Sequence, residues 1–445
     1  MYRREFLQLI KLATPLVIAQ LAQNSLSFVD TLMVGRLGNN ELAGIALGAT
    51  VFHFVLIVLS GVLFGVNPIV SQAIGAGDRS KAVVGVRQGL LVGVVLFLPA
   101  FIFYWNCYPV LIALGQDADT ALASSQYLRA ISWGLLPALW MMALRGFLEG
   151  NSDTWPIMGI AILGIGANIA LNYVLMFGKY GFPELGLVGT GYASSIVFTC
   201  GLLLLVGYVY AKYFDDRIFR QIWKPDFAMI KELFAVGGPI GMTLGFEMGM
   251  FSAAAIAMGT LSATELAAHQ IALQTSSLSF MIPLGIAIAI SVRVGQAVGA
   301  GAIDRAKVAG FVGMMACFAV MVVFALLFLL LPRSIVSIYV DTTDVENLKV
   351  VKYALSFLAI AALFQIFDGM QVAASNALRG LKDTKAAMIL TLISYWGMGA
   401  PAGALMCYVF DMRGIGLWLG MTVGLAAAAL LLTARFQQQI KRRSA

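Results

Sequence analysis

The chain has 445 residues, of which 60% are hydrophobic and only 11% are charged. Because soluble domains carry about 25% charged residues, this composition excludes an ordinary water-soluble fold and indicates a protein whose solvent is the lipid bilayer. The formal net charge is +7. No basic run alternates with aromatic residues in the pattern of a nucleic-acid groove, so we expect no nucleic-acid partner and place the excess lysine and arginine on cytoplasmic loops.

Apolar segments long enough to cross a bilayer, about 20 residues each, follow one another along the chain. They predict an all-α polytopic membrane protein with twelve transmembrane helices. The predicted spans are 8–34, 43–74, 83–105, 122–147, 155–178, 186–212, 229–259, 265–295, 306–331, 347–378, 385–410 and 414–435.

The basic residues give the orientation. If the N-terminus lies inside, most of the 29 lysine and arginine residues fall on inner connections. The positive-inside rule therefore predicts that both termini are cytoplasmic, which requires an even number of spans.

The two halves of the chain resemble each other. The sequence QAIGAG at 72–77 returns as QAVGAG at 296–301, and the Leu-Arg-Gly motif that contains Arg145 returns around Arg379. These echoes keep their order, so the sequence predicts an internal duplication into lobes 1–212 and 228–445, joined by a cytoplasmic linker at 213–227. Because each half has an even number of spans, we expect two parallel six-helix repeats.

Three acidic residues lie within predicted spans, Asp30 in the first, Glu247 in the seventh and Asp368 in the tenth. None has a basic residue within one helical turn. Apolar surroundings disfavour the charged form of a lone carboxylate, so a proton, a sodium ion or a cationic ligand would stabilise it. We interpret the three acids as candidate cation-coupling residues. The alternative is an acid at a span end that reaches interfacial water, and this applies most to Asp30.

Other polar or flexible residues within the spans are weaker candidates. Asn168 and Asn172 are four residues apart and so share a helix face, where they would bind a ligand or hydrogen-bond to a neighbouring helix. Gln274 is a similar candidate. Met250 lies near an acid and would suit the wall of an adaptable cavity.

Two prolines, Pro15 and Pro239, occupy equivalent places in the first and seventh spans. A proline removes a backbone hydrogen bond and permits a kink in a helix. Each proline therefore predicts either a hinge or a static kink.

Sequence signals for an enzyme are weak. No Walker A loop is present, so ATP is not expected as the energy source, and we expect neither enzymatic activity nor a cofactor. Asp215 and Asp216 form the closest approach to a metal-diphosphate motif, but they stand in the basic central connection.

Taken together, these motifs resemble the multidrug and toxic compound extrusion (MATE) family, in particular its bacterial NorM-like branch. The resemblance covers essentially the whole chain. It rests on Phe-Val-Asp-Thr at 28–31, Pro-Ile-Val-Ser-Gln at 68–72, the two Leu-Arg-Gly motifs, and Asn172 followed by Tyr173.

The resemblance implies two six-helix lobes around a central cavity in a bacterial inner membrane. It implies export of cationic amphipathic compounds in exchange for Na⁺ or H⁺, with Glu247 and Asp368 at the coupling cation and Asp30 in a proton-coupling or substrate role. Phe364 takes the place of a tyrosine that neighbours the cation in some relatives, which removes a possible oxygen ligand for sodium. We expect a monomer.

Two other functions remain open from the residues. One is a flippase for lipid-linked oligosaccharides, which would need a cationic cavity for a diphosphate. The other is a membrane-embedded transferase, which would need paired acids at the interface to hold a metal-diphosphate.

Overall fold

The structure is a computed structural model that describes residues 1–34 and 39–444, apart from the side chains at 26–32, 34 and 39–42. Every regular element in these ranges is a helix. The α-helices are α1 (Tyr2–Val34), α2 (Asn39–Leu63), α3 (Val66–Gly75), α4 (Arg79–Trp105), α5 (Cys107–Ala113), α6 (Ala118–Ser132), α7 (Leu135–Gly150), α8 (Trp155–Met176), α9 (Gly186–Lys212), α10 (Phe227–Leu261), α11 (Ala263–Gly299), α12 (Ile303–Leu330), α13 (Pro332–Val336), α14 (Leu348–Gly380), α15 (Thr384–Leu392), α16 (Ala400–Ala404) and α17 (Arg413–Ser444). Two short 3₁₀-helices, Phe214–Asp216 and Val345–Asn347, and two π-helices, Ile393–Gly399 and Leu405–Val409, complete the set.

Membrane-spanning segments account for most of these helices. Among the described residues, 11 helical segments are long and apolar enough to cross a bilayer, and the number rises to 12 when the bent pair α6 and α7 counts as one span. These two helices meet at an angle of 50°. The predicted all-α membrane fold with twelve spans is confirmed. The predicted span 43–74 is built from α2 and α3, and the predicted span 385–410 alternates between α-helical and π-helical turns.

The chain divides into two compact units, which we call the C-unit (Met1–Val17 with Met242–Ala445) and the N-unit (Ile18–Gly241). The long helices α1 and α10 each contribute residues to both units. The predicted lobes, 1–212 and 228–445, differ from these units in the helix segments at 1–17 and 228–241, and their boundaries stay a prediction.

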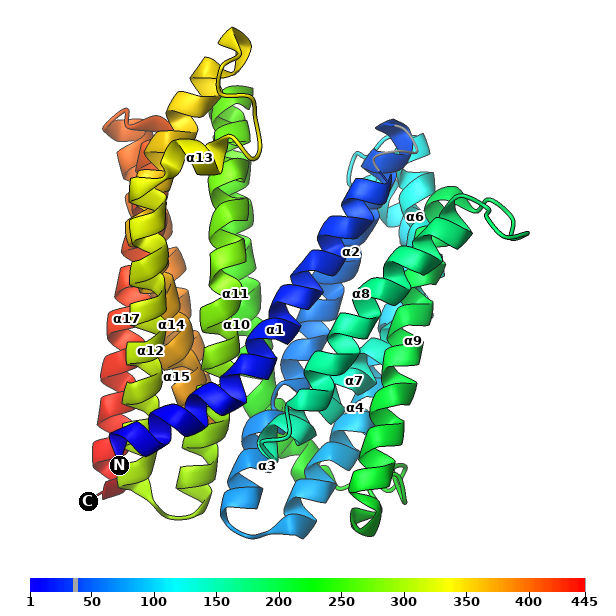
Figure 1. Ribbon diagram of the computed structural model, residues 1–445, viewed down its shortest axis with the longest axis vertical. Helices are drawn as coiled ribbons and strands as arrows, with labels where there is room; N and C mark the ends of the chain where they lie inside the picture. The colour runs from blue at the N-terminus through cyan, green and yellow to red at the C-terminus, as the bar shows by residue number, and fades with distance from the viewer. Residues whose placement is uncertain (35–38, 445) are drawn as a thin grey trace. The chain divides into compact units, whose positions relative to one another are not determined.

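In the C-unit, α14 is the central helix and packs against α11, α12 and α17 (Figure 1). The start of α11 is fixed by a capping box, because the Ser262 hydroxyl accepts a hydrogen bond from the backbone N–H of Glu265 at 3.1 Å. The Glu265 carboxylate is fully buried and accepts two hydrogen bonds from Arg413, at 3.0 and 3.1 Å. This ion pair joins the start of α11 to the start of α17.

At the N-terminus, α1 is held to the C-unit by a second ion-pair cluster. The buried Glu5 carboxylate accepts hydrogen bonds from Arg293 of α11 at 2.7 Å and from Arg305 of α12 at 2.6 Å. Gln8, one turn further along α1, accepts from both guanidinium groups. One carboxylate thus balances the charges of two arginines. These ion pairs stabilise the packing of the first turns of α1 in the C-unit.

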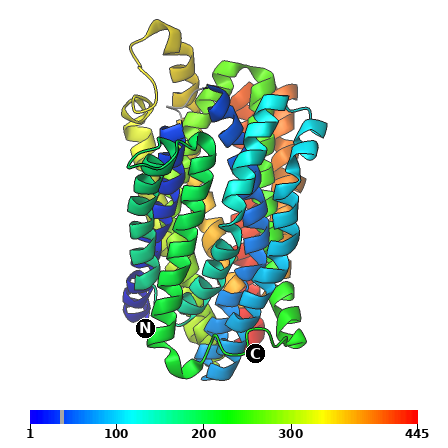
Figure 2. The same cartoon turned by 90° about the vertical axis from the view of Figure 1, so that its right-hand side faces the viewer.

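In the N-unit, α8 and α9 run side by side (Figure 1 and Figure 2). The helix α2 crosses the part of α10 that belongs to this unit so closely that a Cβ atom on Gly61 would lie 2.1 Å from the Cα atom of Gly241. Glycine is required at such a crossing because any side chain would separate the two backbones.

The duplicated Asp-Thr motifs have the same structural task in both units. Asp153, just before α8, accepts hydrogen bonds from Lys212 at 2.9 Å and from Tyr213 at 3.0 Å. Asp383, just before α15, accepts from Arg435 of α17 at 2.7 Å. Burial and the nearby Asp153 carboxylate raise the pKa of Tyr213, so its phenol remains a hydrogen-bond donor. Each aspartate thus ties the start of the penultimate span of its repeat to the end of the last span.

We predict that Glu5→Gln lowers the stability of the protein. The substitution keeps the side-chain shape but leaves Arg293 and Arg305 without a counter-charge. Breaking a buried ion pair costs about 3 kcal/mol or more, and the partial exposure of Arg305 places the expected cost near the lower end. Thermal unfolding of the purified protein in detergent should show a midpoint several degrees below native. Glu346→Gln, at an exposed position, is the control, and equal midpoints for the two variants would contradict the prediction.

Candidate functional site

The C-unit brings together two acids that are far apart in the sequence. Glu247 of α10 and Asp368 of α14 interact electrostatically. Asp368 is 6% exposed, and its Oδ1 atom has no hydrogen-bond partner among the described residues. Glu247 is partly exposed. A buried carboxylate with an unpartnered oxygen atom is costly in a membrane-spanning helix, so this pair is a candidate place for a bound cation or proton.

Neutral polar side chains surround Asp368 on the same face of α14. Gln365 and Gln371 lie three residues before and after it, and both are buried. Gln365 accepts a hydrogen bond from the Ser279 hydroxyl at 2.9 Å. The Oε1 atom of Gln371 has no hydrogen-bond partner in the described part of the chain. The surroundings of Asp368 therefore hold oxygen atoms that are available to a ligand.

A π-helical turn delivers a tyrosine to this place from a third helix. Tyr395 lies in the π-helix Ile393–Gly399 and is fully buried. Its hydroxyl faces Gln371 and is within electrostatic range of both carboxylates. The next residue, Trp396, donates a hydrogen bond from Nε1 to the carbonyl oxygen of Phe246, at 3.2 Å, immediately before Glu247. π-Turns inside α-helices often mark functional sites. This π-helix therefore supports the interpretation of Glu247 and Asp368 as a candidate functional site.

A basic residue also reaches the acids. Arg379 lies eleven residues after Asp368 in α14, a spacing of about three helical turns that keeps it on the same side. It interacts electrostatically with Glu247. The sequence shows no base within one helical turn of Glu247 or Asp368, and only the folded structure brings Arg379 near Glu247. The repeated Leu-Arg-Gly motif, which contains Arg379, was the one sequence feature that pointed to this arginine.

Arg379 has a counterpart in the N-unit. Glu247 stands eight residues after Pro239, and Gln23 stands eight residues after Pro15, so the two occupy equivalent positions in the repeats. Gln23 accepts a hydrogen bond from Arg145 at 3.3 Å, as Glu247 interacts with Arg379. The duplication thus placed a neutral amide in one unit and a carboxylate in the other.

Three further candidates lie in the C-unit. Phe364 is buried one turn before Asp368, and its ring makes an edge contact with Trp418 at 5.3 Å between centroids, so it belongs to the aromatic core. Met250 is buried one turn after Glu247 and lines a hollow together with Trp396. Gln274 is exposed on α11. Their proposed roles in a cavity stay predictions.

Two of the remaining candidates meet in the N-unit. Asn168 and Asn172 are both fully buried in α8, and Asn172 Nδ2 donates to Asn168 Oδ1 at 3.1 Å. The predicted shared face is therefore present, whereas a ligand role stays a prediction.

The predicted hinges and the third acid lie in α1 and α10. Pro15 and Pro239 lie inside these helices, each two residues before the last residue that the helix contributes to one unit. The predicted hinge role is compatible with that position and stays a prediction. Asp30 falls within α1, but its side chain lies outside the described residues.

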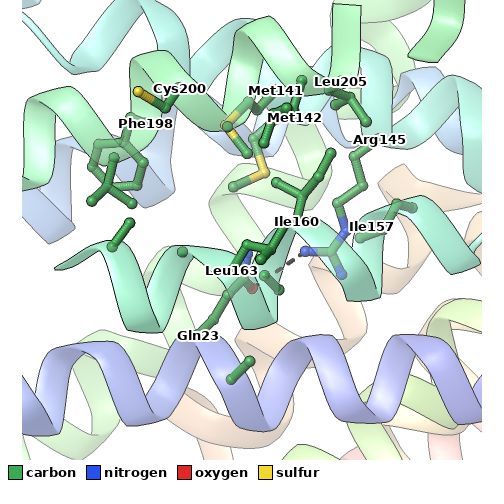
Figure 3. Close-up of a pocket in the computed structure, with 17 residues that line it drawn as sticks. Gln23, Met141, Met142, Arg145, Ile157, Ile160, Leu163, Phe198, Cys200 and Leu205 are labelled. Carbon is green, nitrogen blue, oxygen red and sulfur yellow. Dashed lines mark hydrogen bonds between the residues drawn. The ribbon is translucent and has the colours of Figure 1, made fainter. Parts of the chain in front are cut away.

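The N-unit contains an open hollow among α1, α7, α8 and α9 (Figure 3). Its walls are largely apolar. Side chains that line it include Gln23, Met141, Met142, Arg145, Ile157, Ile160, Leu163, Phe198, Cys200 and Leu205. Figure 3 shows Arg145 and Gln23 bonded to each other at one end of this wall. A ligand here would meet apolar surface over most of its length and polar groups at one end.

The positive charge of Arg145 is balanced by Glu149, which lies one turn later on the same helix. Its Nε atom donates to Glu149 at 2.7 Å, and the other Glu149 oxygen accepts from Asn67 at 2.7 Å. Gln20 accepts from the same guanidinium at 2.8 Å. Both charged side chains are largely buried, 11% and 7% exposed. The polar end of the hollow is therefore close to neutral.

Comparison with known proteins identifies the chain. A family model described as MatE matches residues 15–174 and 239–405. The chain belongs to the MATE family. It is 36% identical over 448 residues to a protein named "Probable multidrug resistance protein NorM" from Brucella suis biovar 1 (strain 1330), covering 99% of this chain and 95% of that protein. A protein of the same name from Pseudomonas aeruginosa is 38% identical, with 98% and 90% covered.

The fold agrees with this assignment. The crystal structure of the eukaryotic MATE transporter AtDTX14 superposes with a TM-score of 0.86 at 22% sequence identity, covering 99% of this chain and 98% of that one. The family resemblance found in the sequence is therefore confirmed, and so is the helical architecture of this MATE protein.

We predict that Glu149→Gln destabilises this MATE protein by leaving Arg145 buried and uncompensated, at a cost of about 3 kcal/mol. Its thermal unfolding midpoint in detergent should fall by several degrees. Replacing both partners, Arg145→Met with Glu149→Met, should recover most of the loss, because an apolar pair needs no counter-charge. If the double variant is less stable than Glu149→Gln, an uncompensated charge is not the cause.

Proposed function

We propose that the chain is a secondary multidrug antiporter that exports cationic amphipathic compounds in exchange for Na⁺ or H⁺. The observation that carries the proposal is the carboxylate pair of Glu247 and Asp368 within membrane-spanning helices. Asp368 has an unpartnered oxygen atom, so a cation or proton that binds there gains interactions that the folded chain does not supply. The names of the relatives support multidrug resistance as the physiological role.

Coupling follows from the energetics of this pair. Two carboxylates in a low-dielectric site repel each other, and a bound cation or proton removes the repulsion. If one state of the transporter binds this ion more tightly than the other, ion binding shifts the protein toward that state. Drug binding that favours the opposite state then gives exchange by alternating access.

The hollow in the N-unit is the proposed place for the apolar part of a drug. The hollow is open, and its wall is largely apolar, which suits the apolar part of a ligand. Methionine and phenylalanine in its wall adapt to ligands of different shape. Because Glu149 compensates Arg145, the polar end does not repel a cation strongly. The preference for cations rests on the acids Asp30, Glu247 and Asp368.

We further propose that the protein works as a monomer in a bacterial inner membrane with both termini in the cytoplasm. The last turn of α17 carries Lys441, Arg442 and Arg443, which favours the cytoplasmic side for the C-terminus.

We predict that Glu247→Gln and Asp368→Asn each reduce ion-driven drug efflux at least tenfold, because neither amide can bind or release the coupling charge. Purified protein in liposomes would be given a fluorescent organic cation, and a sodium gradient and a pH gradient would be imposed separately. Glu346→Gln is the control at an exposed position. Unchanged coupled efflux in both site variants would overturn the antiporter proposal. Gradient-independent movement of lipid-linked oligosaccharides would favour the flippase instead.

We predict that Gly164→Leu weakens drug binding about tenfold, because the new side chain would occupy the hollow that Gly164 lines. Gly166→Leu is a matched control, since Gly166 lies on the same helix outside the lining and a Cβ atom there meets open space. Fluorescence anisotropy of a labelled organic cation on the detergent-solubilised protein measures the affinity. Equal affinities for the two variants would place the drug elsewhere.

A further inference from the structure

We propose that the connection between α9 and α10, together with the first turns of α10, is a docking surface for anionic phospholipid headgroups. The connection, residues 213–226, joins two membrane-spanning helices, so both of its ends lie at the bilayer interface. The sequence predicts only a linker at this place. The proposal gives the segment a partner, and it does not depend on the proposed antiport.

Basic side chains of this region lack counter-charges within the protein. Four of them are exposed and form no ion pair in the described part of the chain, namely Arg217, Arg220, Lys224 and Lys231. The acids Asp215 and Asp226 are also exposed here, and Asp226 accepts a hydrogen bond from the Met229 backbone N–H at 3.0 Å. Four bases and two acids leave an excess of positive charge that is complementary to an anion.

Aromatic side chains accompany these bases. Phe214, Trp223 and Phe227 are 59%, 67% and 78% exposed. Phe227, Lys231 and Phe234 share one face of α10, since they are spaced four and three residues apart. Aromatic rings and basic groups at the end of a span suit the headgroup level, where the rings meet apolar chains and the bases meet phosphates. A soluble anion would use the bases alone, so the exposed rings favour a lipid.

The connection is held against the N-unit at its first turn. The Nε atom of Arg79, at the start of α4, donates to Asp216 at 2.9 Å, and its Nη1 atom donates to Asn151 at 2.6 Å. The same guanidinium lies 5.2 Å from the centroid of the Tyr213 ring. These contacts fix the segment that enters the connection from α9.

Further contacts fix the backbone that carries the bases. Arg87 of α4 donates to the carbonyl oxygen atoms of Arg217 at 2.6 Å and of Ile218 at 2.9 Å. The next residue, Gln88, donates to the Lys224 carbonyl at 3.0 Å. Arg217 has a φ of 49°, a left-handed conformation that a non-glycine residue keeps only where its surroundings fix it. The surface is therefore preorganised, and a headgroup that binds it orders little further backbone.

The test measures lipid binding by the full-length protein in dodecyl maltoside micelles. Phosphatidylglycerol would be titrated, with phosphatidylcholine as the neutral reference, and native mass spectrometry would count the lipids bound. We expect the native protein to bind phosphatidylglycerol in preference. Glutamine at all four bases should raise the half-saturating phosphatidylglycerol concentration at least tenfold, because each base attracts the anionic headgroup. The combined variant is Arg217→Gln, Arg220→Gln, Lys224→Gln and Lys231→Gln.

A matched control removes the same charge elsewhere. Four other exposed bases, outside this surface, would be replaced together, by Lys179→Gln, Arg333→Gln, Lys349→Gln and Lys352→Gln. This variant should bind phosphatidylglycerol as the native protein does. Equal losses in the two variants would show that net charge alone attracts the lipid and would overturn the proposal, as would native binding in the first variant. Equal unfolding midpoints in phosphatidylcholine would show that both variants fold.

A second measurement separates a lipid from a soluble phosphate. Trp223→Ala combined with Phe227→Ala should weaken phosphatidylglycerol binding at least threefold while all four bases remain. Glycerol 3-phosphate, which has the headgroup charge without acyl chains, should not displace the lipid at equal concentration. Displacement by glycerol 3-phosphate would identify a site for soluble phosphates and overturn the lipid assignment. None of these readouts uses transport, so their failure leaves the antiporter proposal intact.

Discussion

A bilayer core contains no water, so each charged side chain within the spans must find its partner in the protein. This constraint organises both units. In the C-unit, Glu5 and Glu265 are each buried against arginines from other helices. In the N-unit, Arg145 and Glu149 compensate each other within one helix. Asp368 departs from this rule, because one of its oxygen atoms has no partner among the described residues.

The internal duplication shows how one unit acquired a charged site. The Leu-Arg-Gly motif of each repeat places an arginine near the equivalent residue of the first helix of that repeat. In the N-unit that residue is Gln23, and Arg145 is compensated by Glu149 instead. In the C-unit it is Glu247, which interacts with Arg379 and with Asp368. The same backbone plan thus gives a neutral hollow in one unit and an acidic site in the other.

Under the proposed function, the hollow and the acid pair would serve different parts of an exchange reaction. An apolar hollow with a compensated polar end binds through surface area and shape, and such binding tolerates many ligands. A site formed by two acids would bind an ion mainly through charge, and such binding would tolerate few ligands. Under the proposed function, a drug site that accepts many compounds and a specific ion site would be combined in one chain.

The membrane fold was readable from the sequence because hydropathy and helix length respond to the bilayer alone. Those signals predicted the twelve spans, and the ordered echoes predicted the duplication. The acids Glu247 and Asp368 were also visible, since a carboxylate is conspicuous in an apolar run. Their proximity was not, because it depends on how the folded chain brings Glu247 of α10 near Asp368 of α14.

The position of Tyr395 was equally hidden in the sequence. A tyrosine in an apolar span looks like an interfacial or core residue until a π-turn aims it at two carboxylates. The sequence by itself therefore determined which groups the membrane would penalise. Only the tertiary structure decided which of them would meet, because helix crossings and helix distortions arise from side-chain packing between segments that are distant in the chain.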